Sequence, residues 1–320
     1  MPDGGERWEL RRGEEGWPPS LESLEQPPDV IYGMGDRSTL TNSCLSVIGA
    51  RRATPYGLAA ARLAGRVAAE SGITLVSGGA LGCDAASARA ALDAGGTTIV
   101  VSGTGADKVY PRSSEDVFAR ARTYGAVISL EPWGAPPKRY TFPRRNPIIA
   151  ALSQSTVICE AGRHSGTFST AMAAAQMGRD LYVIPGSIFS PESMGANQLI
   201  ADGAYIIPSE MDLEQRISLD YGVLRMVREG VPRTEGRIVS ALISEPTRAD
   251  DLARFLGESV VGILGALADY ESKGMVRRLP DGRFSLTESA YLAHDRMVRR
   301  HGDELAQDGG GGASCQTIGG

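Results

Sequence analysis

Residues 45–79 read LSVIGARRATPYGLAAARLAGRVAAESGITLVSGG, and this stretch decides the fold. The apolar runs 45–49 and 73–77 have the length of buried strands, and the Ala-rich stretch 56–70 between them has the length of a helix. A strand, a helix and a second strand in this order are typical of a parallel sheet. We therefore expect the sheet to be built around this unit.

The same alternation continues toward the C-terminus. Further strand candidates are 97–103, 126–130, 156–160, 181–185 and 204–208, and helical stretches lie at 84–94, 114–123, 146–153 and 166–178. Continuous apolar strands separated by helices indicate a sheet that is covered on both faces. The predicted fold class is therefore α/β, with a Rossmann-like, doubly wound, mostly parallel sheet.

Composition shifts divide the chain into segments. After about residue 230, three helical stretches and a hairpin with a turn at Pro280-Asp281-Gly282 predict a C-terminal winged-helix domain. The expected organisation is a flexible segment (1–25), the Rossmann-like domain (26–220), the winged-helix domain (230–290) and a disordered tail (302–320).

Several classes of protein are disfavoured by composition. No apolar stretch reaches about 18 residues, and the N-terminus lacks the apolar core of a signal peptide, so we expect no membrane association and a cytoplasmic location. Four cysteines and three histidines without ligand spacing predict reduced thiols and no metal site. Neither a dinucleotide-binding nor a P-loop motif occurs, so no cofactor is expected.

The charge is unevenly distributed. The net charge is −5, yet Cys44 to Glu210 holds 15 basic and 12 acidic residues. Between Glu131 and Glu160 there is no acid, while four basic residues occur there: Lys138, Arg139, Arg144 and Arg145. This pattern favours an anionic ligand bound at one place, although an ordinary solvated loop has the same composition.

Three glycine-rich turns follow predicted strands. They are Gly49-Ala50-Arg51, SGGALGCD (77–84) and AGRHSGTFSTA (161–171). Ligands of doubly wound sheets bind outside the carboxyl ends of the strands, where exposed N–H groups at a helix start suit a phosphate. Close helix–strand packing also requires glycine, so a single turn of this kind is weak evidence.

Several segments occur in the order found in a known family: VIGARRATPYG (47–57), VSGGALGCDAA (76–86), SGTGADKVYP (102–111), FPRRNPIIAALS (142–153), EAGRHSGTFSTAMAAAQMGRDLYVIPG (160–186) and GANQLIADGA (195–204). They resemble the DNA-processing protein A (DprA, or Smf) family over about residues 26–215. The resemblance implies a non-enzymatic protein that binds single-stranded DNA, protects it during natural transformation and helps load the RecA recombinase. It also implies a homodimer, and a DNA phosphate held at Gly49-Ala50-Arg51.

Residues and resemblance together predict a DNA- and phosphate-binding set with no catalytic member: Gly49, Arg51, Arg52, Ser77, Gly78, Gly79, Lys138, Arg139, Phe142, Arg144, Arg145, Asn146, Ser165, Gly166 and Thr167. Basic side chains interleaved with aromatic rings suit a single strand. Structural roles stay open for some of them. Phe142 is also a core candidate, and Asn146 and Thr167 are also helix-cap candidates. Tyr110 is interpreted as structural and His164 as solvated.

The chain departs from the family pattern at a few positions. Many relatives have histidine where Ala88 stands, and Pro147 and Ala151 replace a usual arginine and glycine. The loss of that arginine removes one positive charge from the expected groove.

Charge also bears on the winged helix and on alternative functions. Residues 229–288 hold 8 basic and 10 acidic residues, which favours a protein-contact or structural role over duplex DNA recognition.

One alternative function for the protein is a nucleotide phosphoribohydrolase, although HSGTFSTAMA lacks the glutamate of that enzyme signature. The other is a nucleotide-sensing adaptor.

Overall fold

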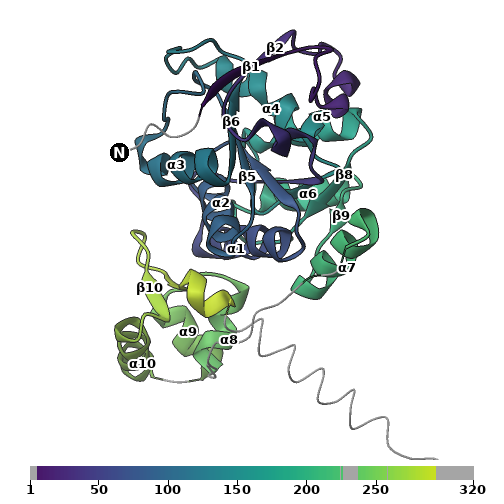
Figure 1. Cartoon of the computed structure of the whole chain (residues 1–320). Coiled ribbons are helices and arrows are strands. Elements are labelled where there is room, and N and C mark those ends of the chain that lie inside the picture. Colours follow the sequence, from purple (N-terminus) through teal and green to yellow (C-terminus); the bar gives the residue numbers. More distant parts are fainter. Residues whose placement is uncertain (1–5, 224, 226–236, 258, 293–320) are drawn as a thin grey trace, which may run out of the picture. The chain divides into compact units, whose positions relative to one another are not determined.

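The structure is a computed structural model that describes residues 6–223, 225, 237–257 and 259–292. The chain divides into two compact units, Met1–Arg228 and Glu229–Gly320. The first unit contains a nine-stranded sheet flanked by helices (Figure 1). In the described part of the chain, no helix has both the length and the apolar character needed to cross a membrane.

The sheet of the first unit is mixed and mostly parallel, which confirms the predicted α/β class. Its strands follow the order β1-β2-β6-β5-β4-β3-β7-β8-β9. The parallel strands are β3 (Cys44–Ile48), β4 (Thr74–Ser77), β5 (Thr98–Ser102), β6 (Gly125–Ser129), β7 (Ser155–Ile158), β8 (Asp180–Val183) and β9 (Tyr205–Ile206). Two antiparallel strands, β1 (Arg7–Arg11) and β2 (Val30–Gly35), extend the sheet beyond β6.

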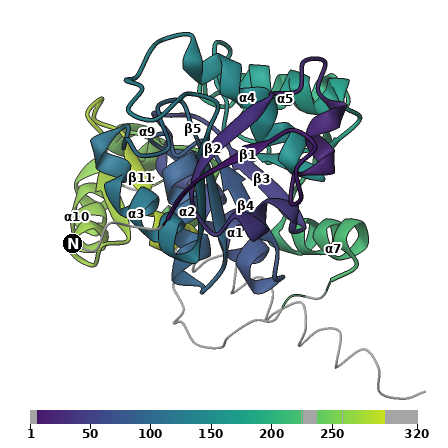
Figure 2. The same cartoon turned by 45° about the horizontal axis from the view of Figure 1, so that its top comes forward.

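Helices cover both faces of the sheet. Helices α1 (Pro55–Glu70), α2 (Cys83–Asp93), α3 (Glu115–Tyr124) and α7 (Glu210–Tyr221) contribute to one apolar cluster, and α4 (Thr141–Leu152), α5 (Thr167–Gln176) and α6 (Met194–Ala201) contribute to the other. Figure 2 shows α4 and α5 on the opposite side of the strands from α1 and α2.

The strand order reverses between β3 and β7. From β3 the chain adds β4, β5 and β6 in one direction, and after α4 it returns to place β7 on the other side of β3. In open α/β sheets such a reversal leaves a crevice outside the carboxyl ends of the two strands, because the following connections diverge.

The N-terminal segment differs from the sequence expectation. Residues 1–25 are expected to be flexible, but from Arg7 onward the chain forms β1 and a short 3-10 helix, Pro19–Ser23. The reason is three buried apolar side chains, Leu10, Trp17 and Leu21, which join the cluster under α4. The residues around these three are mostly polar, so the average composition of the segment does not reveal its apolar side chains.

The second unit contains three helices and a hairpin. Helices α8 (Arg237–Ser244), α9 (Ala249–Leu256) and α10 (Val260–Ser272) precede the antiparallel strands β10 (Val276–Arg278) and β11 (Phe284–Leu286). A bridge between Thr247 and Phe284 joins the hairpin to the turn before α9. Its core is apolar and separate from that of the first unit. The tail expected at 302–320 lies outside the described residues.

The cysteines of the first unit are buried free thiols. Cys44, Cys83 and Cys159 are each 1% exposed or less, and burial raises the pKa of Cys44 to about 12. Thiolates are the reactive form, so these side chains are packing residues at neutral pH. Across the described ranges, no group of three or more His, Cys, Asp or Glu side chains is placed to hold a metal ion.

Candidate functional site

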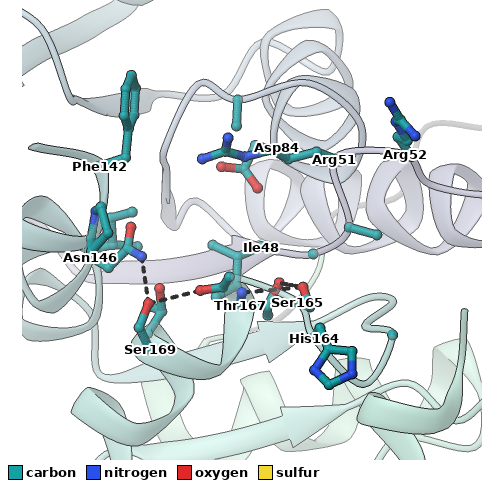
Figure 3. A pocket seen from close by; sticks show the side chains of 18 of the residues that line it. Ile48, Arg51, Arg52, Asp84, Phe142, Asn146, His164, Ser165, Thr167 and Ser169 are labelled. Atoms are coloured by element: carbon teal, nitrogen blue, oxygen red, sulfur yellow. Dashed lines mark hydrogen bonds between the residues drawn. The ribbon is translucent and has the colours of Figure 1, made fainter. Parts of the chain in front are cut away.

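A pocket with a volume of about 640 Å³ lies where the strand order reverses. Its walls are the turn after β3, the start of α4 and the turn after β7. Figure 3 shows Phe142 and Asn146 on one side, Arg52 and His164 on the other, and Ser165 and Thr167 between them. Four arginines and two carboxylates line it: Arg51, Arg52, Arg145, Arg163, Asp84 and Glu192.

The turn after β3 is held by its backbone. The Ala50 N–H donates to the carbonyl of Glu160 at 2.8 Å, and the Cys83 N–H donates to the carbonyl of Ala50 at 3.1 Å. Gly82 has a φ of +75°, and a Cβ there would lie 2.1 Å from the Ala50 oxygen. Only glycine fits this close approach. The backbone is thus fixed while the Arg51 side chain stays exposed.

The start of α1 is tied to the end of β7 by a buried carboxylate. Glu160 is 2% exposed and accepts hydrogen bonds from the N–H (3.0 Å) and the hydroxyl of Thr54, the N-cap of α1. Burial raises the pKa of Glu160, and the Thr54 hydrogen bonds oppose the shift. Glu160 therefore orders the wall behind Arg51.

The turn after β7 brings the N-terminus of α5 to the pocket. Gly166 is the N-cap and has no side chain to cap the helix, but Ser165 Oγ accepts a hydrogen bond from the Thr167 N–H at 3.3 Å. Thr167 is the first helical residue, so it does not act as the cap. Its hydroxyl accepts a hydrogen bond from Ser165 Oγ at 2.7 Å. Asn146 lies inside α4 and donates to Ser169 Oγ at 2.7 Å, so it is not a cap either. These polar groups at the N-terminus of α5 suit an anion.

Three cations face the pocket without an acidic partner. Arg51, Arg52 and Arg163 are exposed, and among the described residues no carboxylate lies within 4.0 Å of their guanidinium nitrogens. The Arg51 guanidinium carbon lies 5.6 Å from the centroid of the Phe142 ring. Phe142 is half-buried against Gly103 and its ring lies 5.4 Å from that of Tyr110, which is 45% exposed. One rim of the pocket is therefore aromatic and cationic.

Arg145 has a different role from its neighbours. It is 4% exposed, and its Nη1 donates to the carbonyls of Gly78 (2.7 Å) and Val101. The carboxylate of Asp84, 5% exposed, accepts from the N–H groups of Gly78 (2.9 Å), Ala80 and Gly49. Burial lowers the pKa of Arg145 to about 10 and raises that of Asp84, and their mutual attraction opposes both shifts. This buried pair joins the ends of β3, β4 and β5.

The first three residues of the turn after β4 do not open into the pocket. Ser77 and Gly78 are buried, and their polar groups are already hydrogen-bonded within the turn or to the Asp84–Arg145 pair. A Cβ on Gly79 would lie 2.7 Å from Val100, so this glycine serves packing. The prediction that Ser77, Gly78 and Gly79 contact a phosphate therefore does not match their placement. Ala80, one residue on, does line the pocket.

The basic stretch before α4 is also divided by the structure. Lys138 and Arg139 are exposed on a loop and do not line the pocket. Arg144 pairs with Glu131 at 3.1 Å and lines a second cavity, together with Pro147. The missing arginine at position 147 would therefore face that second cavity, away from Arg51.

Some pocket residues were not singled out by the sequence. Arg163 and Ser169 lie in a segment that resembles the family, but only the folded turn shows that they line the same pocket as Arg51. Asp84 follows a glycine-rich turn at the start of α2, where an acid is favoured by the helix dipole alone. No local signal distinguishes its role beneath the pocket from that of an ordinary first-turn acid.

Comparison with known proteins gives the family. Residues 9–218 match the family described as DNA recombination-mediator protein A. The chain belongs to the DNA recombination-mediator protein A (DprA/Smf) family. Protein Smf of Escherichia coli K12 is 29% identical over 288 residues, which cover 87% of this chain and 77% of that protein. The resemblance inferred from the motifs is thereby confirmed.

Solved structures of DprA proteins agree with this assignment. The structure of DNA processing protein A from Streptococcus pneumoniae has a TM-score of 0.62 and 31% identity, covering 66% of this chain and 74% of that one. The Helicobacter pylori protein, whose structure concerns its single-stranded DNA binding mode, has a TM-score of 0.62 and 29% identity, covering 69% of this chain and 99% of that one. The role of this chain is therefore DNA processing of the DprA type.

Proposed function

We propose that the pocket between β3 and β7 binds the sugar-phosphate chain of single-stranded DNA. The observation that carries the proposal is that Arg51, Arg52 and Arg163, none of them ion-paired among the described residues, line the same pocket as the N-terminus of α5, at the strand-order reversal. Guanidinium groups and a helix N-terminus are both suited to bind a phosphate.

The proposed contacts divide by chemistry. Arg51, Arg52 and Arg163 would pair with phosphates, and Ser165, Gly166 and Thr167 would donate to phosphate oxygens. The Phe142 ring would contact an unpaired base, because every base has an apolar face and base–aromatic stacking tolerates any sequence. Asn146 and Arg145 would hold the wall rather than the DNA, since their side chains are already hydrogen-bonded to protein groups.

A salt series with two forms of DNA tests this function. Fluorescence anisotropy with labelled oligo-dT, and with the same strand paired to oligo-dA, should show tighter binding of the single strand. The logarithm of the association constant should fall linearly with the logarithm of the salt concentration, by about 0.7 per phosphate contact. Equal affinity for the duplex, or affinity independent of salt, would contradict the proposal.

We also propose that the protein is not an enzyme. Support comes from the two carboxylates that line the pocket, because both accept hydrogen bonds from protein groups: Asp84 from backbone N–H groups, and Glu192 from the Ser190 hydroxyl at 2.8 Å. A glycosidic-bond hydrolase needs a carboxylate that is free to act on the substrate. Release of adenine from AMP, detected by chromatography, would overturn this proposal.

We propose homodimerisation through the edge of the sheet at β9. Tyr205 and Ile206 are each 48% exposed, and β9 has no neighbour on its outer side among the described residues. Uncovered edge strands are sites where another chain can pair. Sedimentation velocity should show a dimer that dissociates in Ile206→Lys; a wild-type monomer at all concentrations would exclude it.

We infer that the DNA-bound protein protects incoming strands in natural transformation and helps load the RecA recombinase, which places its work in the cytoplasm. We also infer that the second unit is a winged helix that contacts protein rather than duplex DNA. Its acidic balance and its exposed Phe255 (78%) and Val261 (81%) support protein contact. The loading role is tested by the rate at which RecA filaments form on single-stranded DNA. If adding this protein does not increase that rate, the loading role is wrong.

A further inference from the structure

Two large apolar side chains lie exposed on the loop after β8. Ile188 and Phe189 are each 76% exposed, more than any apolar residue of the pocket rim. Neither contributes to an apolar cluster of the first unit. Isolated exposed apolar residues are common, but an adjacent aliphatic–aromatic pair on one turn is a candidate contact surface.

The loop that carries this pair is held by hydrogen bonds. Asn197 of α6 accepts from the Gly186 N–H at 3.1 Å and donates to the Gly186 carbonyl at 3.0 Å. Two further turns follow, with N–H to carbonyl distances of 3.1 Å from Ser190 to Ser187 and 3.0 Å from Ser193 to Ser190. The backbone beneath Ile188 and Phe189 is therefore fixed at both ends, and little ordering is needed when a ligand binds.

The same loop forms part of the pocket wall. Pro191 and Glu192 line the pocket, and the Pro191 carbonyl packs on Gly162, where it would lie 3.4 Å from an added Cβ. Phe189 is two residues before Pro191, and two residues of chain span at most about 7 Å. The Phe189 backbone therefore lies within about 7 Å of the pocket lining. Gly162 belongs to the turn that carries His164, and Figure 3 shows His164 on the side opposite Phe142.

We propose that Ile188 and Phe189 form a second base-contacting surface, across the pocket from Phe142. This inference rests on the proposed single-stranded DNA function. A bound strand would place a phosphate between Arg51 and the N-terminus of α5, one base against Phe142, and the bases on the other side of that phosphate against Ile188 and Phe189. The strand would thus run from the start of α4, over the turn after β7, to the loop after β8.

The chemistry of the surroundings favours an unpaired strand as the occupant. A ligand that covers Ile188 and Phe189 from the pocket side must present apolar faces while it carries negative charge past Arg51, Arg52 and Arg163. A single strand offers both at each nucleotide. A duplex does not, because its bases are stacked and paired inside.

Alanine substitution at Phe189 tests the surface. We expect Phe189→Ala to lower the affinity for oligo-dT by roughly fivefold or more, the usual effect of losing one stacked base. The slope of affinity against salt should stay unchanged, because no phosphate contact is removed. On an abasic oligonucleotide, which keeps the phosphates and lacks the bases, wild type and variant should bind equally. The matched control is Phe255→Ala, since Phe255 is as exposed but lies in the second unit.

The outcomes separate this inference from the proposed function. If wild type binds oligo-dT but Phe189→Ala binds it equally well, the second surface is wrong while the pocket assignment stands. If wild type does not bind single strands, both are wrong. A Phe189→Ala variant that binds DNA normally but no longer self-associates in sedimentation velocity would assign the pair to an interface between copies of the chain and overturn the proposal. An equal loss on abasic DNA would overturn it as well.

Discussion

Replacing Arg51 by alanine should weaken binding of oligo-dT by about ten- to a hundredfold. Arg51 has no acidic partner in the described part of the chain, and the backbone of the residue before it, Ala50, is fixed by hydrogen bonds to Glu160 and Cys83. The guanidinium is therefore held ready for phosphate, and charge-assisted hydrogen bonds of this kind are among the strongest in proteins. The salt slope should fall by about 0.7, the value for one phosphate contact on a single strand.

Arg144→Ala is the matched control for this measurement. Arg144 is also an exposed arginine, but it pairs with Glu131 and faces the second cavity. Its removal should change the affinity by less than about twofold, because long-range screened charges contribute little. If Arg144→Ala and Arg51→Ala lose affinity equally, the DNA follows the basic stretch that the sequence suggested, and the pocket is not the main contact.

Replacing Arg145 by alanine should destabilise the first unit by about 3–5 kcal/mol, the usual result of leaving a buried charge without its counter-charge. The change would leave the Asp84 carboxylate buried without its counter-charge and the carbonyls of Gly78 and Val101 without their donor. Urea unfolding followed by tryptophan fluorescence measures this unit alone, because all three tryptophans, Trp8, Trp17 and Trp133, lie within it.

The adjacent arginine again provides the comparison. Arg144→Ala should change the free energy of unfolding by less than about 1 kcal/mol, because exposed ion pairs contribute little. A double variant, Asp84→Asn with Arg145→Met, should lose less stability than the two single changes added together, since the partners share one interaction. Additive losses would mean that Arg145 acts through packing and not through Asp84.

The sequence predicted the sheet well because its signals are local. Apolar runs such as 45–49 and 73–77, with Ala-rich stretches between them, identify strands and helices without any knowledge of the rest of the chain. The prediction was wrong for β1, since a strand that buries only Leu10 completely has no apolar run to detect. Its pairing with β2 is decided by tertiary contacts.

The site was harder to predict because it depends on which charged side chains lie next to one another in the folded chain. Arg144 and Arg145 are neighbours in a stretch free of acids, yet one folds back onto Glu131 and the other is buried beside Asp84. Both acids lie outside that stretch. Similarly, the turns after β3, β4 and β7 look alike as sequences, but the turn after β4 is filled by the Asp84–Arg145 pair. The residue roles within the site stay predictions.

The two cationic walls of the pocket are remote from each other in the chain. Arg51 and Arg163 stand 112 positions apart and meet only because β7 is laid down beside β3 after three other strands have been added. Neither segment alone contains both walls of the pocket. The complete pocket therefore exists only after β7 has paired with β3. By mass action, an occupied pocket must in turn favour the folded chain, by an amount that grows with the logarithm of ligand concentration.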